Sequence, residues 1–87
     1  MYVILVYDVN VKRVAKMLKL CRRYLHWIQN SVFEGELTEM QLKRLKAEID
    51  QLIESGEDSV IIFSSRQSSW MEKEIVGVNK NELDQFI

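Results

Sequence analysis

The chain has 87 residues, of which 47% are hydrophobic and 29% are charged. This length and composition are typical of one folded domain and leave no residues for a second core. Twelve basic and thirteen acidic residues give a formal net charge of −1, which excludes a surface that is basic throughout. No apolar run approaches the roughly 20 residues of a membrane span, so we expect no membrane partner. The single cysteine, Cys21, cannot form an intrachain disulfide and fits a cytoplasmic location.

The basic residues are unevenly distributed along the chain. Residues 9–33 contain no acidic residue and six basic ones, namely Lys12, Arg13, Lys16, Lys19, Arg22 and Arg23. Such a local excess can create a cationic surface on a molecule of nearly neutral charge. From charge alone, an ordinary solvated helix face explains the pattern equally well.

The first third of the chain predicts a strand followed by a helix. Residues 2–7 are β-branched or aromatic on both faces, as in a central strand, and this strand ends at Asp8. Asn10 is placed to cap the helix after it. From Val11 onward, apolar residues recur at three and four positions, which predicts a helix of about four turns. The pattern predicts that its buried side consists of Val11, Val14, Ala15, Leu18, Cys21 and Leu25, with the cations largely on the exposed side.

The middle of the chain predicts two short strands and a second helix. Residues 26–37 are strand formers interrupted near Asn30 and Ser31, which favours a short strand, a kink or bulge, and a second strand. Thr38 and Gln41 form a capping-box pattern that begins the helix, and Gly56 is its expected stop. Residues 59–63 and 70–76 are expected to be further strands, separated by a polar turn over 64–69.

The predicted order is β-α-β(β)-α-β-β. Two helices on one face of a mainly antiparallel sheet form an α+β sandwich, and the ferredoxin-like arrangement fits this order best. The alternative is a three-stranded parallel α/β unit, which requires residues 26–36 to form one unbroken strand. We expect residues 1–77 to form the core and residues 78–87 to form a C-terminal extension.

Asp8 is the most informative carboxylate, because it stands where a core strand leaves the sheet. Mg²⁺ prefers oxygen ligands and often accepts only one or two protein carboxylates. A two-fold axis near this edge would bring a second Asp8 alongside, and a metal between the two would activate water against a phosphodiester. The alternative is that Asp8 only caps the helix that begins near Val11.

Arg13, Ser31, Phe33 and His26 are further residues whose chemistry can be considered from the sequence. Arg13 is expected near Asp8, where it would either clamp a phosphate or form an ion pair with that carboxylate. Ser31 is a candidate to hydrogen-bond a substrate oxygen, and Phe33 is a candidate base-stacking residue, although a core or interface position is favoured for it. His26 is the only histidine, so we expect neither a zinc site nor a histidine-based catalytic triad.

Three segments are informative together: residues 6–9 (VYDV), 12–16 (KRVAK) and 28–35 (IQNSVFEG). With the hydrophobic strand that begins near Asp58, they resemble the small CRISPR adaptation protein family, the second of the core CRISPR-associated proteins. The resemblance covers residues 1 to about 77. It implies a ferredoxin-like homodimer in which a Mg²⁺ ion is shared by the two copies of Asp8. It also implies that residues 83–87 add a strand to the sheet of the partner subunit.

The resemblance implies two activities. One is metal-dependent endonuclease activity on single-stranded RNA or double-stranded DNA. The other is spacer acquisition with the larger integrase subunit, in which the dimer holds nucleic acid on its basic surface without catalysis, with Lys16 and Lys19 among the candidate contacts. Arg13 and Phe33 match family positions, whereas Val11 and Trp27 stand where some members carry basic residues.

Overall fold

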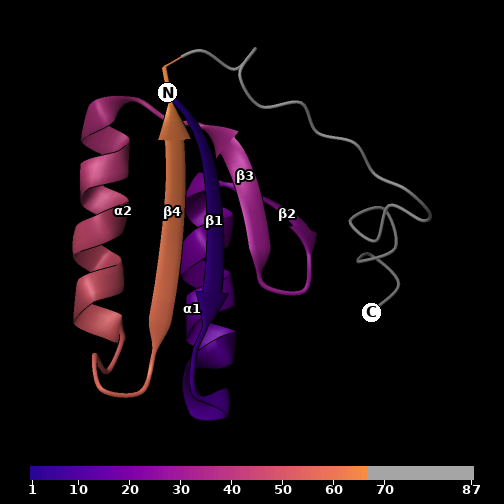
Figure 1. The fold of residues 1–87 in the computed structure, drawn as a ribbon, viewed down its shortest axis with the longest axis vertical. Helices are drawn as coiled ribbons and strands as arrows, with labels where there is room; N and C mark the ends of the chain where they lie inside the picture. The colour runs from indigo at the N-terminus through magenta and orange to yellow at the C-terminus, as the bar shows by residue number, and fades with distance from the viewer. Residues whose placement is uncertain (67–87) are drawn as a thin grey trace.

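The structure, a computed structural model, describes residues 1–66, which form a four-stranded sheet with both helices on one side (Figure 1). The elements in chain order are β1 (Tyr2–Asp8), α1 (Val11–Tyr24), β2 (His26–Gln29), β3 (Val32–Glu36), α2 (Glu39–Leu52) and β4 (Ser59–Ser65). The strand order across the sheet is β2-β3-β1-β4, and every neighbouring pair is antiparallel. This is the ferredoxin-like α+β sandwich that the sequence predicts.

The core lies between the sheet and the two helices. Successive side chains of a strand point to opposite faces, and in β1 the residues Val3, Leu5 and Tyr7 are buried toward the helices. The Tyr7 ring stacks on Phe33 of β3 with 5.9 Å between the ring centroids. The helices contribute Met17, Leu20, Cys21, Leu42, Leu45 and Ile49 to the same core. β1 is therefore held on both edges and on one face, which fixes the position of its last residue.

Both helices begin as predicted. The Asn10 side chain accepts a hydrogen bond from the Lys12 N–H (3.1 Å), which caps α1. At α2, Thr38 and Gln41 exchange both hydrogen bonds of a capping box. The prediction for the end of α2 is wrong, because the helix ends at Leu52, before Gly56.

The predicted buried side of α1 is partly wrong. Val11 is 86% exposed and Val14 is also exposed, whereas Met17 and Leu20 are buried. The helix is rotated so that Arg13 lies on its inner side, where the Arg13 side chain is only 11% exposed. An arginine can occupy this place because acidic side chains of another loop neutralise it, an interaction that helical periodicity cannot reveal.

Residues 26–36 form two antiparallel strands, so the parallel α/β alternative is wrong. The kink predicted near Asn30 and Ser31 is the turn between them, and Asn30 adopts a left-handed conformation with φ of 47°. A register shift lies between Trp27 and Gln29 in β2.

The last described strand, β4, continues to Ser65, so the polar turn does not begin at residue 64. The expected strand at 70–76, the end of the core at residue 77 and the extension 78–87 lie outside the described residues. Neither helix in residues 1–66 has the length and apolar character that crossing a bilayer requires.

Candidate functional site

Asp8 is the last residue of the central strand, where it pairs with Ser59 of β4. Its side chain is exposed and, by strand alternation, points to the sheet face that the helices leave uncovered. Asn10 caps α1, so the interpretation of Asp8 as the helix cap is wrong. No hydrogen bond or ion pair from another described residue occupies the Asp8 carboxylate.

Asp8 borders a shallow hollow of about 350 Å³. Its lining consists of Tyr7, Asp8, Val9, Val14, Asn30 and Ser31. The β2–β3 turn is held against the end of β1 because the Tyr7 N–H donates to the Ser31 carbonyl (3.1 Å). The fold therefore brings Ser31, a predicted substrate contact, and the neighbouring Asn30 to the hollow that Asp8 borders.

Arg13 does not pair with Asp8. Its Nε donates to Asp58 Oδ2 (2.6 Å), and its Nη2 donates to Asp58 Oδ1 (3.0 Å) and to Glu57 Oε2 (2.5 Å). The Asp58 side chain is fully buried. Two nitrogens of the guanidinium are therefore committed to the loop before β4, and the predicted ion pair between Arg13 and Asp8 is wrong.

Asp58 also accepts hydrogen bonds from two backbone groups, the N–H of Asn10 (2.8 Å) and the N–H of Glu54 (2.9 Å). We refer to Asp58, Arg13 and these two N–H groups as the Asp58 cluster. The hydrogen bond from Arg13 is the largest of the effects that hold the pKa of Asp58 well below its usual value. The same contact raises the pKa of Arg13 above its ordinary range.

Phe33 lies in the core and is 0% exposed. Its ring stacks on Tyr7, so it has no free face for a nucleobase, and its candidacy as a base-stacking residue is corrected in favour of the core alternative. Cys21 is likewise buried, and burial raises the pKa of its thiol to about 12, as expected for a small core residue.

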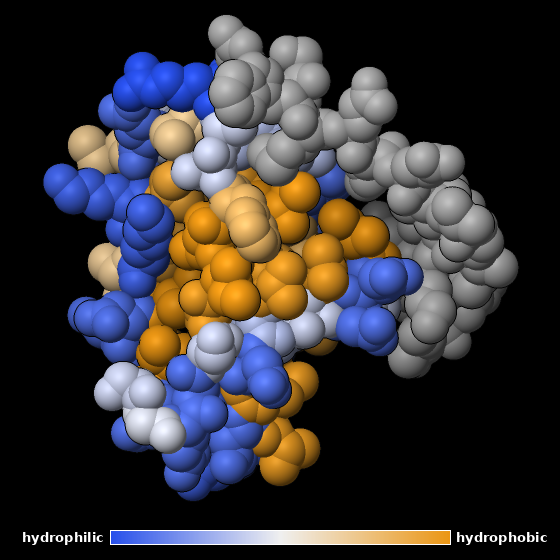
Figure 2. Space-filling view, viewed as in Figure 1, coloured by the Kyte–Doolittle hydropathy of each residue, from blue (hydrophilic) through white to orange (hydrophobic). Residues whose placement is uncertain are grey.

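The uncovered face of the sheet is apolar (Figure 2). Ile61 and Phe63 of β4 are 51% and 54% exposed there, and their partners in β1, Val6 and Ile4, lie beside them. We refer to these four residues as the apolar face. Asp8 points to the same side of the sheet, two residues beyond Val6. An exposed apolar cluster of this kind is typical of a surface that binds another protein.

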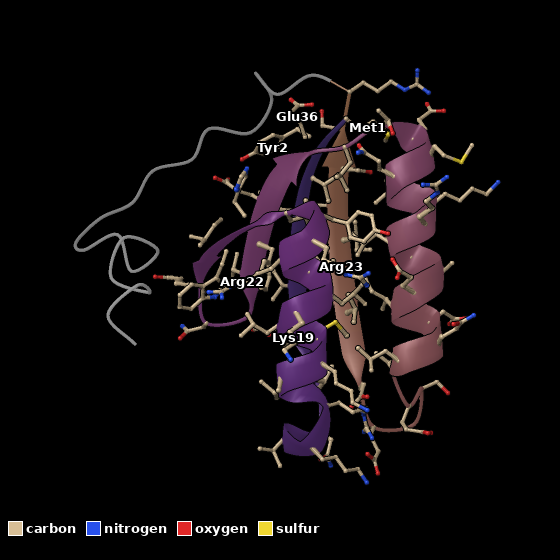
Figure 3. All side chains as sticks on the ribbon, turned by 180° about the vertical axis from the view of Figure 1, so that it is seen from behind. Met1, Tyr2, Lys19, Arg22, Arg23 and Glu36 are labelled. Atoms are coloured by element: carbon tan, nitrogen blue, oxygen red, sulfur yellow. The ribbon has the colours of Figure 1, made fainter. Side chains whose placement is uncertain are left out.

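The opposite side of the molecule is cationic. Lys19, Arg22 and Arg23 lie on α1, on the side of the helices seen in Figure 3. A shallow hollow of about 580 Å³ is lined by Lys16, Lys19, Leu20, Arg22 and Arg23. We refer to its four basic residues as the cationic face. Lys16 and Lys19 are exposed, as predicted. They belong to α1, which covers one face of the sheet, whereas Asp8 points to the uncovered face.

One acidic residue of α2 borders the cationic face. Glu48 accepts hydrogen bonds from Arg23 Nη2 (2.9 Å) and from the Tyr24 hydroxyl. The hydrogen bond from Tyr24 is the main cause of a lowered pKa at Glu48, and the same bond raises the pKa of Tyr24. Arg22 lies over the ring of Trp27, 5.5 Å from its centroid.

The other end of β1 carries acidic neighbours (Figure 3). The Met1 ammonium donates to the Leu37 carbonyl (2.6 Å) and lies 3.5 Å from Glu36. The Tyr2 hydroxyl donates to Glu34, and this hydrogen bond is the main cause that raises the pKa of Tyr2 to about 12. This end is a poor place for a phosphate backbone, because its carboxylates repel the negative charge.

The donor set at Asp8 fits Mg²⁺ as half of a site. Within residues 1–66, no three His, Cys, Asp or Glu side chains come together in a way that could hold a metal ion. One chain therefore offers the Asp8 carboxylate, with Asn30 and Ser31 lining the same hollow. Because Mg²⁺ commonly uses one or two carboxylates and completes its shell with water and phosphate, a second Asp8 would give a sufficient donor set.

The fold and these surfaces define a class: a small ferredoxin-like protein with an exposed carboxylate at the end of its central strand and a cationic helical face. The family model of the CRISPR associated protein Cas2 matches residues 1–73. The chain belongs to this family.

Relatives of known name match the whole chain. The CRISPR-associated endoribonuclease Cas2 of Thermotoga maritima is 52% identical over 87 residues, which cover all of this chain and 99% of that protein. The protein of the same name from Dictyoglomus turgidum is 49% identical, with complete coverage of both chains. A solved crystal structure of Cas2 superposes with a TM-score of 0.84 at 45% identity and covers 92% of this chain and 90% of that one.

Sequence reasoning missed Asp58 and Asn30 as site residues. A signal for Asp58 was present, because the strand after it is antiparallel to β1 and so begins at the sheet end where β1 finishes. Asn30 stood in the predicted kink, and only the hydrogen bond between Tyr7 and Ser31 shows that this kink meets the end of β1.

Proposed function

We propose that this chain is a nucleic-acid-binding homodimer of CRISPR adaptation. It takes part in spacer acquisition with the larger integrase subunit and cleaves phosphodiester bonds of single-stranded RNA or double-stranded DNA in the presence of Mg²⁺. The observation that carries the catalytic part is the exposed Asp8 carboxylate at the end of a rigid central strand, without a partner among the described residues. The names of the relatives, which call them endoribonucleases, support the same activity.

The homodimer is supported by the apolar face. Ile61 and Phe63 are each about half exposed, and burying such side chains against a second copy is favourable. A two-fold contact uses the same patch on both subunits. Because Asp8 projects from this same side of the sheet, the contact would bring two Asp8 carboxylates toward one another.

Asp8 from each copy would hold Mg²⁺, and Ser31 and Asn30 would border the substrate from the same hollow. When bound, Mg²⁺ supplies Lewis-acid chemistry for phosphodiester hydrolysis. Asp8 itself would orient the ion and balance its charge. It ends β1 and borders the hollow, so the backbone of the central strand sets the position of its carboxylate. Arg13 contributes indirectly, because Asp58 and Glu57 engage its guanidinium.

The test uses the substitution Asp8→Asn, which keeps the shape of the side chain and removes its charge. Cleavage of single-stranded RNA and double-stranded DNA in Mg²⁺ is measured beside binding affinity for the same substrates. We expect cleavage to fall by orders of magnitude, with affinity unchanged or higher. The matched control is Asp50→Asn on the exposed side of α2, which should leave both quantities unchanged. Undiminished cleavage by the Asp8 variant would refute the catalytic role.

A purely non-catalytic DNA-binding scaffold is the second candidate. It is favoured by the separation of the surfaces, since the cationic face lies on the helical side and Asp8 points to the uncovered side of the sheet. A strand bound along α1 would therefore not pass over Asp8 of the same subunit. If the scaffold is the whole function, Asp8→Asn leaves spacer acquisition intact in cells, whereas neutralising the cationic face abolishes it.

The dimer has its own test. Phe63→Glu and Ile61→Glu place a charge in the middle of the apolar face, where two copies would have to bury it. We expect light scattering after size-exclusion chromatography to show dimers for the parent chain and monomers for these variants. Met40→Glu on α2 is the control, because Met40 is 62% exposed on another side of the molecule. Dimers in all the variants would rule out the apolar face as the contact.

A further inference from the structure

The β1–α1 turn that carries Asp8 is joined to a distant loop by a buried carboxylate. Asp58, 48 residues from Asn10 in the chain, accepts the Asn10 N–H, while Arg13 in the first turn of α1 donates to both Asp58 oxygens. A fourth hydrogen bond, from the Glu54 N–H, ties the same carboxylate to its own loop. The turn after Asp8 is therefore connected to the α2–β4 loop by backbone and side chain at once.

Two contacts constrain the backbone of Asp8, one through its strand partner in β4 and one through the turn that follows β1. Asp8 is opposite Ser59, which directly follows Asp58, and two residues beyond Asp8 the Asn10 N–H returns to Asp58. Displacing the Asp8 backbone would stretch at least one of these contacts. Because the Asp58 side chain is fully buried, losing its partners would leave an unpaired charge away from water.

From these contacts we infer that Asp58 is a positioning residue for Asp8, and that Arg13 acts through Asp58 instead of through substrate phosphate. The inference rests on the proposed function of Asp8 as a metal ligand. Outer groups of metal sites fix the direction of a ligand without touching the metal. The Asp58 cluster would do this for Asp8 through the backbone of the β1–α1 turn. A related consequence concerns Glu57, which accepts from the same Nη2 of Arg13 as Asp58 does. Because the Glu57 side chain is 51% exposed, its contribution is smaller.

The experiment compares Asp58→Asn with Asp8→Asn and with the control Asp50→Asn. Asp58→Asn keeps the shape of the side chain and removes the charge that Arg13 binds. All variants are studied as full chains below their unfolding temperatures, with the fold checked by circular dichroism. Mn²⁺ is the metal probe, titrated with detection by electron paramagnetic resonance in the absence of nucleic acid. Amide hydrogen exchange at Val9 and Asn10 reports on the turn itself.

We expect Asp58→Asn to weaken Mn²⁺ binding by about 10- to 100-fold, the range typical for outer groups of metal sites. We also expect faster amide exchange at Val9 and Asn10, with unchanged exchange in the middle of α2. In cleavage assays, kcat should fall with little change in KM, because the substrate backbone is held elsewhere. Asp50→Asn should match the parent chain in every measurement.

The outcomes separate this inference from the proposed function. If Asp8→Asn abolishes Mn²⁺ binding while Asp58→Asn leaves affinity and amide exchange at parental values, the positioning role is overturned and the function stands. If Asp8→Asn binds Mn²⁺ as well as the parent chain, the proposed metal site is wrong. The hold of Asp58 on the turn is then decided by amide exchange, and unchanged exchange overturns it.

Should Asp58→Asn fail to fold, Arg13→Lys is the second variant. Lysine keeps the positive charge but cannot donate to both Asp58 oxygens in the fork geometry of arginine. We expect Arg13→Lys to lose Mn²⁺ affinity and amide protection as well, but less of each than Asp58→Asn loses. Parental affinity and protection in a folded Arg13→Lys chain would overturn the role of Arg13.

Discussion

Two arginines of the same helix show how differently this molecule uses one residue type. Arg13 is enclosed, with a side chain 11% exposed and bound to a fully buried Asp58, whereas Arg23 is 62% exposed and bound to a partly exposed Glu48. The first pair belongs to the Asp58 cluster and joins two loops. The second belongs to the cationic face, where competition from water and ions keeps a pair weak. The positive charge at the start of α1 therefore stabilises the fold, whereas the positive charges along the outer side of this helix are accessible to a ligand.

The difference between the two arginines is tested most directly by replacing each of them with alanine. Arg13→Ala leaves the buried Asp58 without its counter-charge, and we expect the unfolding temperature to fall by several degrees. Arg23→Ala removes an exposed ion pair and should change the unfolding temperature by less than about 2 degrees. Thermal unfolding followed by circular dichroism measures both. Equal losses would show that the two arginines do not differ in their structural role.

The accessible charges should govern the salt dependence of nucleic-acid binding. Replacing both Lys16 and Lys19 with alanine should make the slope of log affinity against log salt less steep by about 1.8, which is about 0.9 for each lost contact with B-form DNA. Fluorescence anisotropy at several salt concentrations gives this slope. The matched control is Lys43→Ala with Lys46→Ala, a pair of the same spacing on α2. An unchanged slope in the first variant would remove Lys16 and Lys19 from the interface.

The enclosed charges should govern stability in acid. The pKa of Asp58 in the folded chain is held below its ordinary value of about 3.9. The contribution of the ionised Asp58 to the free energy of unfolding is therefore complete above that value, and it is lost as pH falls through the folded pKa. Urea unfolding of the parent chain and of Asp58→Asn, at about pH 6 and at about pH 3.5, measures this. The stability gap between the two should narrow at the lower pH. A gap independent of pH would contradict the assignment.

The smallest expected effect concerns the acidic residue beside the cationic face. Glu48 holds Arg23 and competes with a phosphate for it. Glu48→Gln should raise the affinity for duplex DNA roughly two- to fivefold at low salt, in line with the strength of an exposed ion pair. Anisotropy titrations at two salt concentrations measure it, and the gain should shrink at high salt. A weaker affinity would mean that Glu48 orients Arg23 for binding.

The elements themselves were readable in the sequence, because local chemistry determines them. The β-branched run of β1, the Asn10 cap and the Thr38–Gln41 capping box are short-range patterns, and each is found where it was predicted. The position of Asp8 at the end of the central strand follows from the same patterns. These features depend on residues a few positions apart, so no tertiary contact was needed to find them.

What the tertiary structure decided was the rotation of α1 and the surroundings of Asp8. Periodicity assigned Val11 to the core and Arg13 to solvent, and both assignments are reversed because Asp58, 45 residues away, neutralises Arg13. For Phe33 the core position that the sequence favoured is confirmed, and the pairing of β3 with β1 supplies its partner, the Tyr7 ring. A buried charge is stable only beside its counter-charge, and that pairing is a property of the folded chain, which no local pattern encodes.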